Sequence, residues 1–235
     1  MTVLGVAGEV LLTLGVVLGL FVVWQLWWTN LDAAAAQEDA VTEMAQQFGA
    51  SAPATGADAE YGDPVVEQAP GYGQGVGIVY IPRFGSDYAR PVMEGTGGDV
   101  LDALGLGHYE GTAMPGGIGN FAVAGHRQTN GKVLDLIHTL EPGDRIHVRT
   151  AAGYYTYAVE THEVVLPTEV RVVAPDPQEP GAEPVRRLLT LTSCHPRFGD
   201  TERYVVHAAL ESWRPAQAGP PGEIAAAVAD DTPRS

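Results

Sequence analysis

The sequence has a single cysteine, Cys194, among 235 residues. One cysteine cannot form a disulfide within the chain, so a hydrophobic core has to hold the fold together. The hydrophobic content of 45% is sufficient for one such core. A lone thiol is either a small buried side chain or a reactive group, and the count alone favours burial.

Lysine and arginine are absent from residues 1–82, which carry nine Asp and Glu side chains. Basic residues begin at Arg83, and the net charge of the whole chain is −16. Binding a phosphate backbone requires clustered cations. The charge pattern therefore excludes nucleic acid as a partner.

Metal-binding and phosphate-binding patterns are also lacking. The histidines show no His-x-x-x-His spacing and there is no second cysteine, so we expect no metal site. The glycines Gly116, Gly117 and Gly119 lead into a β-rich run and not into a helix, which indicates a turn and not a nucleotide loop. We expect no cofactor.

An apolar run extends from Val10 to Trp28 and, together with residues 3–8, reaches the ~20 residues needed to cross a bilayer. A cleaved signal peptide is the alternative, but such segments have a basic start and a small-residue cleavage site. This run ends with three tryptophans between Trp24 and Trp28, which suit the headgroup interface. Residues 1–30 are therefore predicted to be a retained single-pass membrane anchor, with the rest of the chain on the extracellular side.

Three further segments differ in composition. Residues 31–75 begin with good helix formers and continue with Ala, Gly, Pro and acidic residues, which predicts a juxtamembrane helix followed by a flexible acidic linker. Residues 76–213 consist of short β-rich runs bounded by Gly, Pro and Asp, as expected for the globular domain. Residues 214–235 are predicted to be a disordered tail.

The globular domain is predicted to be mainly β, with one short helix near 99–104. Short strands and few helices favour a barrel or a sandwich, and we favour a mixed barrel with small helices in its connections. The expected strands are 77–81, 89–94, 120–125, 145–150, 154–165, 187–193 and 204–213.

Cys194 stands where an apolar strand gives way to a loop, a position from which a rigid scaffold presents a side chain to a substrate. Arg203 opens the next strand, so a hairpin would bring its guanidinium beside the sulfur. The alternative for Arg203 is a surface charge paired with Glu202 or Asp200. The setting of Cys194 favours a nucleophile.

A cysteine attacks as a thiolate and needs a basic or cationic neighbour. His126 ends the run NFAVAGH, a strand of small residues that is suited to lie beneath a cleft. His195 adjoins Cys194, but neighbours on an extended chain point to opposite sides. His126 is therefore the candidate base.

The segments AGHR (124–127), TLTSC (190–194) and RY (203–204) resemble the His, Cys and Arg motifs of sortases. Their order, spacing and strand context agree, and the N-terminal anchor and acidic spacer are similar to those of class E sortases of actinobacteria. The resemblance implies an eight-stranded sortase β-barrel preceded by a transmembrane helix. It also implies a cysteine transpeptidase that acts on secreted proteins bearing a C-terminal sorting signal.

The implied mechanism uses three residues of this chain. Cys194 would attack a Thr-Gly bond, His126 would protonate the departing amine, and Arg203 would hold the substrate or stabilise the oxyanion. An amine of a peptidoglycan precursor or of a pilin would then resolve the thioacyl intermediate.

The resemblance also implies a substrate preference for Leu-Ala-x-Thr-Gly over Leu-Pro-x-Thr-Gly, associated with a tyrosine at the position of Tyr109. A half-buried aromatic that packs a loop is the alternative for Tyr109. Thr192 shares a strand face with Cys194 by alternation and is expected to line the groove. The connection 166–184 would flank the substrate channel.

Two other functions stay open. An L,D-transpeptidase also uses cysteine and histidine, but its Ser-His-Gly-Cys-Arg pattern is not present around Cys194. A catalytically silent, membrane-tethered β-domain that binds envelope proteins is the second alternative.

Overall fold

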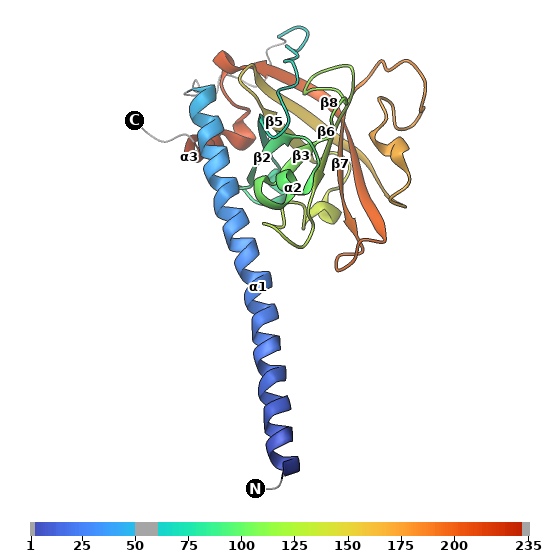
Figure 1. Cartoon of the computed structure of the whole chain (residues 1–235). Coiled ribbons are helices and arrows are strands. Elements are labelled where there is room, and N and C mark those ends of the chain that lie inside the picture. Colours follow the sequence, from blue (N-terminus) through green and yellow to red (C-terminus); the bar gives the residue numbers. More distant parts are fainter. Residues whose placement is uncertain (1–2, 50–60, 232–235) are drawn as a thin grey trace.

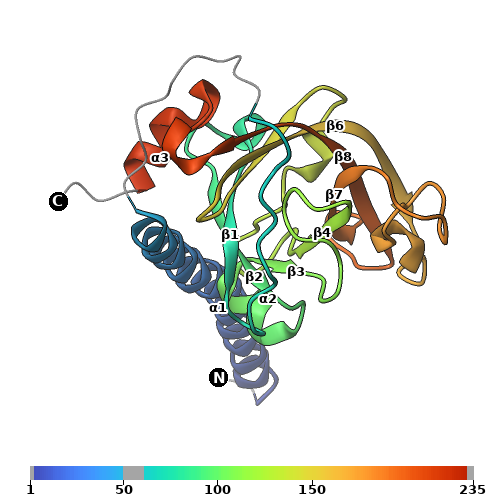
Figure 2. The same cartoon turned by 90° about the horizontal axis from the view of Figure 1, so that it is seen from above.

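A computed structural model describes residues 3–49 and 61–231 of the chain. Eight strands form a closed barrel, and one long helix, α1, lies against its side and extends well beyond it (Figures 1 and 2). The mainly β fold class and the eight-stranded barrel are confirmed.

The strands follow each other around the barrel in the order β1-β2-β3-β4-β7-β8-β6-β5. The pairs β2–β3 and β4–β7 are parallel, so the barrel is mixed. The predicted strands are all present, but β3 was missed because three residues are too short for a period-2 pattern. The strand bounds are β1 Gly75–Tyr80, β2 Ala89–Glu94, β3 Leu106–His108, β4 Gly119–Gly125, β5 Arg145–Arg149, β6 Gly153–Val165, β7 Arg187–His195 and β8 Glu202–Pro215.

The barrel interior is filled by alternate strand residues. On β7, Leu189 and Leu191 are fully buried within the main core, whereas Thr190, Thr192 and Cys194 belong to the opposite, outer face. The outer face of β7 is thus polar and leads along the strand to the cysteine.

Helix α1 runs without a break from Val3 to Phe48, where we had predicted an anchor and a separate juxtamembrane helix. The reason is that no Gly or Pro interrupts residues 20–48. Gly49, with φ of 81°, then ends the helix in the left-handed conformation typical of helix C-termini. The apolar stretch Val3–Phe21 is long enough to cross a membrane and is exposed throughout. The side chains at 25–29, including two of the predicted interfacial tryptophans, lie outside the described part.

The C-terminal half of α1 packs on the barrel. Val41, Met44 and Ala45 are buried in a second apolar cluster together with Ile78 and Val228, among others. A Cβ atom on Gly75 would stand 2.6 Å from the Met44 Cε, so helix and strand β1 approach as closely as a glycine allows. This half of the helix belongs to the globular unit and is not a free spacer.

The segments predicted to be flexible are also packed, as far as they are described. Residues 61–75 run along the barrel, where Tyr155 donates to Val65 O (2.5 Å) and Gly73 N donates to Glu94 O (2.8 Å). Residues 50–60 of the predicted linker and residues 232–235 of the predicted tail lie outside the described residues.

The predicted tail also departs from expectation. Strand β8 reaches Pro215, and helix α3 (Ala225–Asp231) packs beside α1 (Figure 2). The segment is short and acidic, but Ile224 and Val228 are four residues apart, and both are buried against α1 and the barrel. The remaining helix, α2 (Gly98–Leu104), confirms the predicted helical turn.

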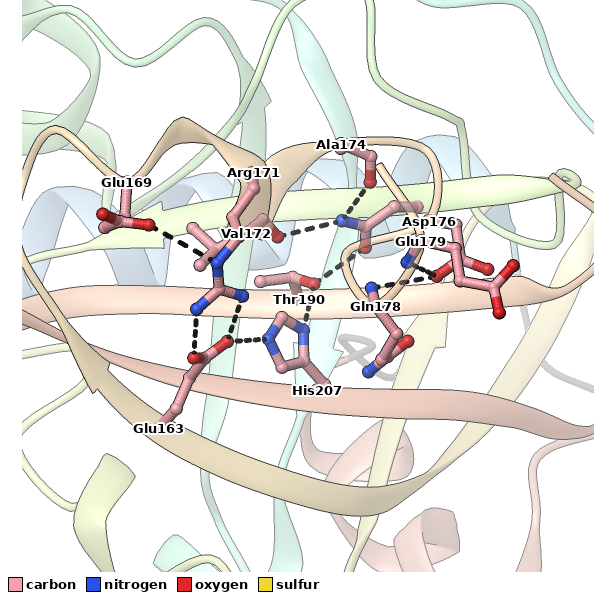
Figure 3. A network of polar contacts seen from close by, with 11 residues as sticks. Glu163, Glu169, Arg171, Val172, Ala174, Asp176, Gln178, Glu179, Thr190 and His207 are labelled. Atoms are coloured by element: carbon pink, nitrogen blue, oxygen red, sulfur yellow. Dashed lines mark hydrogen bonds and ion pairs between the residues drawn. The ribbon is translucent and has the colours of Figure 1, made fainter. Parts of the chain in front are cut away.

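A buried polar network fixes the connection between β6 and β7 (Figure 3). The Asn120 side chain donates to Val172 O (3.2 Å) and Ala174 O (3.0 Å) and accepts from Thr190 (2.8 Å). His207 lies between Thr190 (2.9 Å) and Glu163 (3.1 Å). The connection that flanks the outer face of β7 is therefore held from below by the sheet.

Charge stabilises the edge of this network. Arg171 makes a bidentate pair with Glu163, at 3.0 and 2.6 Å. Its guanidinium lowers the pKa of the Glu163 carboxyl, while burial lowers the pKa of His207. The 3-10 turn at Val170–Val173 is thereby tied to β6.

Met44→Ala should lower the free energy of unfolding by about 2–5 kcal/mol, because it removes a buried side chain and leaves a cavity between α1 and β1. Thermal and denaturant unfolding of the full chain in detergent would measure it. Val170→Ala, at a side chain 75% exposed, is the control and should change stability by less than about 0.5 kcal/mol. Equal effects of the two substitutions would mean that α1 is not packed on the barrel in solution.

Asn120→Asp keeps the shape of the side chain but removes the amide donor. Two buried carbonyl oxygens then lose their partner, at a cost of about 1–3 kcal/mol. We expect faster hydrogen exchange of the amides at 170–174, measured by mass spectrometry, with unchanged exchange in β1 and β5. Unchanged exchange at 170–174 would contradict the role of this network.

Candidate functional site

Cys194 lies near the C-terminal end of β7 and is half-buried. It lines a cavity of about 740 Å³ together with His126, Arg127, Lys132 and Phe198 and, from α1, Asn30. A cysteine that filled the core would be inaccessible. The placement of Cys194 therefore favours a reactive thiol over a packing residue.

His126 follows β4 directly. Strands β4 and β7 are parallel, and Ala124 pairs with Thr192. Continuing that register by two residues brings His126 beside Cys194, on neighbouring chains that are about 4.8 Å apart. The barrel thus delivers imidazole and thiol to the same cavity.

His126 has a carboxylate partner that sequence reasoning missed. Its Nε2 lies 2.7 Å from Asp102 Oδ1, and Asn130 Nδ2 donates to the same oxygen at 2.9 Å. Asp102 is on α2, so no local pattern in the chain points to this contact. Among the described residues, Nδ1 of His126 forms no hydrogen bond.

Arg203 pairs directly with Cys194 in the antiparallel register of β7 and β8. Its Nη1 donates to two backbone oxygens, Asp200 O at 2.8 Å and Glu202 O at 2.9 Å. Among the described residues its guanidinium forms no carboxylate pair, in contrast to the surface-charge alternative. The register places Arg203 across from Cys194, the turn that joins the two strands holds its guanidinium, and Arg203 is not among the described residues that line the cavity.

Arg127 is a second cation beside Cys194 and was not singled out in the sequence. It is 5% exposed, and its Nη1 contacts Cys194 O (3.3 Å) and His195 Nδ1 (2.9 Å). The guanidinium lies over the Tyr204 ring at 5.6 Å. Burial lowers the pKa of Arg127, and the residue clamps the backbone that carries the thiol.

Tyr109 and Thr192 are joined by a hydrogen bond of 2.9 Å between their hydroxyls. Thr192 is 4% exposed and stands two residues before Cys194 on the same strand face, while Tyr109 is half-buried. The structure brings these two predicted substrate-binding residues together, one step along the strand from the cavity.

Other histidines are engaged in packing. His108 is fully buried, with Nδ1 2.7 Å from Glu94 Oε2, and His147 contacts Thr156 and Glu223. Within residues 3–49 and 61–231, no three His, Cys, Asp or Glu side chains gather in a group that could hold a metal ion. The chemistry of the cavity is that of a thiol, an imidazole and cations.

Known proteins resemble this chain in sequence and in fold. The Sortase domain model matches residues 79–211. Sortase SrtE1 of Streptomyces coelicolor is 36% identical over 227 residues, which cover 92% of this chain and 60% of that relative. The chain thus spans less than two thirds of the length of SrtE1.

Solved structures agree with the barrel. The SrtA sortase from Actinomyces oris is 40% identical, with a TM-score of 0.67 over 70% of this chain and 94% of that one. Sortase E1 from Streptomyces coelicolor, solved with a tripeptide in the active site, is 37% identical, with a TM-score of 0.60 over 67% of this chain and 99% of that one. The family model covers more than half of the sequence, and the chain therefore belongs to the sortase family, within which its relatives place it in class E.

Proposed function

We propose that this chain is a transpeptidase that cleaves a Thr-Gly bond in the C-terminal sorting signal of secreted proteins. The observation that carries the proposal is the accessible Cys194, which shares one cavity with His126 and pairs across the sheet with Arg203. Membership of the sortase family supports the same chemistry and argues against the L,D-transpeptidase alternative.

The first half-reaction forms a thioacyl enzyme. The Cys194 thiolate attacks the threonine carbonyl, and the tetrahedral intermediate places negative charge on its oxygen. Arg203 stabilises that charge or holds the substrate carbonyl. The C–N bond then breaks, and the His126 imidazolium gives its proton to the departing glycine amine.

The second half-reaction transfers the protein. An amine of a peptidoglycan precursor or of a pilin attacks the thioester carbonyl, and neutral His126 accepts the proton that the amine loses. Collapse of the second tetrahedral intermediate releases the Cys194 thiolate and forms a new amide bond. The net change is an exchange of one amide for another, so no cofactor is needed.

The Tyr109–Thr192 pair supports a role in choosing the sorting signal. It stands on the outer face of the sheet, one alternate residue before the nucleophile, where the residues preceding the scissile bond would bind. A tripeptide occupies the active site of the related sortase E1, which is in keeping with such a peptide groove.

The exposed apolar stretch of helix α1 supports a membrane anchor, and action on secreted proteins would place the barrel on the extracellular side. Asn30, which lines the cavity, is nine residues past Phe21, where the apolar stretch ends. Nine helical residues extend over about 14 Å, so the cavity would open close to the membrane surface. Exported proteins that are still held in the membrane would be within reach.

Cys194→Ala should abolish cleavage of both Leu-Ala-x-Thr-Gly and Leu-Pro-x-Thr-Gly peptides, because no thioacyl intermediate can form. We expect His126→Ala to lower kcat by about 10²- to 10⁴-fold and Arg203→Ala by about 10²- to 10³-fold. Peptide cleavage by the full chain with an added amine is the measurement. Arg186→Ala removes an exposed arginine on a distant connection and serves as the matched control.

Two results would overturn this proposal: wild-type chain that cuts neither peptide, or a Cys194→Ala variant that cuts as well as wild type. Alkylation by iodoacetamide provides an independent readout. Cys194 should react, and cleavage should be lost in parallel. In a catalytically silent binding domain, the modification would leave the binding of envelope proteins unaffected.

Tyr109→Phe should reduce the preference for Leu-Ala-x-Thr-Gly over Leu-Pro-x-Thr-Gly, measured as the ratio of the two kcat/KM values. Loss of one hydrogen bond, worth about 0.5–1.5 kcal/mol, corresponds to about a two- to tenfold change. Tyr72→Phe, which removes a hydroxyl bonded to Asp99, is the control. An unchanged ratio would leave Tyr109 as a residue that only packs its loop.

A further inference from the structure

We infer that helix α1 is part of the active site: through Gln37 and Asn30 it holds the loop after β4, and through Asn130 and Asp102 it orients His126. The inference rests on the proposed function in that it takes His126 as the acid and base of the reaction. It assigns positioning roles to residues of the membrane-proximal helix and of α2, far from His126 in the sequence.

The first link joins α1 to the loop. Gln37 is 1% exposed, and its Nε2 donates to Asn130 O at 3.1 Å. About two helical turns earlier, Asn30 Oδ1 accepts a hydrogen bond from Gly131 N, also at 3.1 Å. A buried amide donor is costly to leave unpaired, so the bond from Gln37 Nε2 holds the helix and the loop in one arrangement, while Gln37 Oε1 has no partner among the described residues.

The second link is the conformation of the loop. Asn130, Gly131 and Lys132 have φ of 52°, 84° and 52°, three successive residues in the left-handed region. That region is unfavourable for residues other than glycine, so such a run persists where surrounding contacts enforce it. A Cβ atom on Gly131 would stand 2.5 Å from Gln37 Oε1, which shows how closely the helix covers the loop.

The third link runs from the loop to the imidazole. Asn130 Nδ2 donates to Asp102 Oδ1 at 2.9 Å, and the same oxygen lies 2.7 Å from His126 Nε2. The Asp102 side chain is 59% exposed. Exposed ion pairs are weak and their geometry is easily lost to solvent, so Asp102 needs a second tie to keep its direction. Asn130, itself held by α1, provides that tie.

The consequence concerns which ring nitrogen does the chemistry. A carboxylate acceptor at Nε2 keeps a proton on that nitrogen and fixes the plane of the ring. Nδ1 is then the nitrogen that gives its proton to the leaving amine and takes one from the incoming amine. If α1 is displaced, Asn130 and Asp102 lose their positions, and the His126 ring can rotate away from the reacting amine, although Cys194 remains in place.

The test compares two glutamines on the same helix. Gln37→Leu removes the contact with the loop, whereas Gln47→Leu removes an exposed side chain whose one hydrogen bond among the described residues goes to Glu43 in the same helix. In the full chain, Gln37→Leu should lower kcat about tenfold with KM within twofold of wild type, since a misplaced catalytic group affects the chemical step. Gln47→Leu should change neither constant.

A double-mutant cycle examines the route. Asp102→Asn keeps the size of the side chain but weakens the acceptor, and it should lower kcat about as much as Gln37→Leu does. Because both substitutions act through one chain of contacts, the double variant should be no slower than the slower single variant. Additive losses, a change confined to KM, or a Gln37→Leu variant as fast as Gln47→Leu would each overturn the inference.

A readout independent of catalysis separates this inference from the proposed function. Hydrogen exchange of the amides at 130–132 should accelerate in Gln37→Leu and stay unchanged in Gln47→Leu, whether or not the chain cleaves a peptide. If Gln37→Leu accelerates exchange but the wild-type chain cleaves no peptide, the contact between α1 and the loop is supported and the enzyme assignment is refuted. Unchanged exchange would refute the contact itself.

Discussion

The parallel pairing of β4 with β7 is the constraint on which the site depends. In a parallel pair both strands end at the same edge of the sheet, so the residue after β4 and the residue at the end of β7 emerge together. β8 then returns antiparallel and places Arg203 opposite Cys194. If β7 were shifted by one residue against β4, Cys194 would turn into the core and would no longer lie beside His126. One register thus assembles groups that are 68 and 77 residues apart in the sequence.

On the outer face of β7, only Cys194 at the end of the strand is accessible from a cavity. Buried hydroxyls require hydrogen-bond partners, and each threonine on this face has one. Thr190 is covered by the Asn120–His207 network beneath the β6–β7 connection, and Thr192 by Tyr109. Cys194 is the next residue on that face and lines a cavity instead. The side chains that cover Thr190 and Thr192 therefore leave the end of β7, at Cys194, as the accessible part of this face.

Much of this could be predicted from sequence because the signals are local. Alternation and glycine boundaries locate seven strands, and the strand contexts of His126, Cys194 and Arg203 point to one site. The rest depends on contacts between distant segments. Asp102 sits on a short helix with nothing in its neighbourhood to connect it to His126, and Arg127 is distinguished only by its burial. Residues 31–48 are predicted to form a helix, but the four apolar residues of this segment in the second cluster, Val41, Met44, Ala45 and Phe48, do not indicate which surface they pack against.

The continuity of α1 links the apolar stretch Val3–Phe21 to the cavity more tightly than a flexible linker would. A linker would let the barrel tumble, so the height and direction of the cavity above the membrane would vary. In the proposed membrane-anchored enzyme, a single helix with one end apolar and exposed and the other buried against β1 and α3 would fix both. In Figure 1 the turn between β7 and β8 lies at the end of the barrel nearer the apolar half of α1. Under the proposed topology, that geometry would direct Cys194 toward substrates at the membrane surface, and the helix that would enter the membrane also holds the loop after β4 through Asn30 and Gln37.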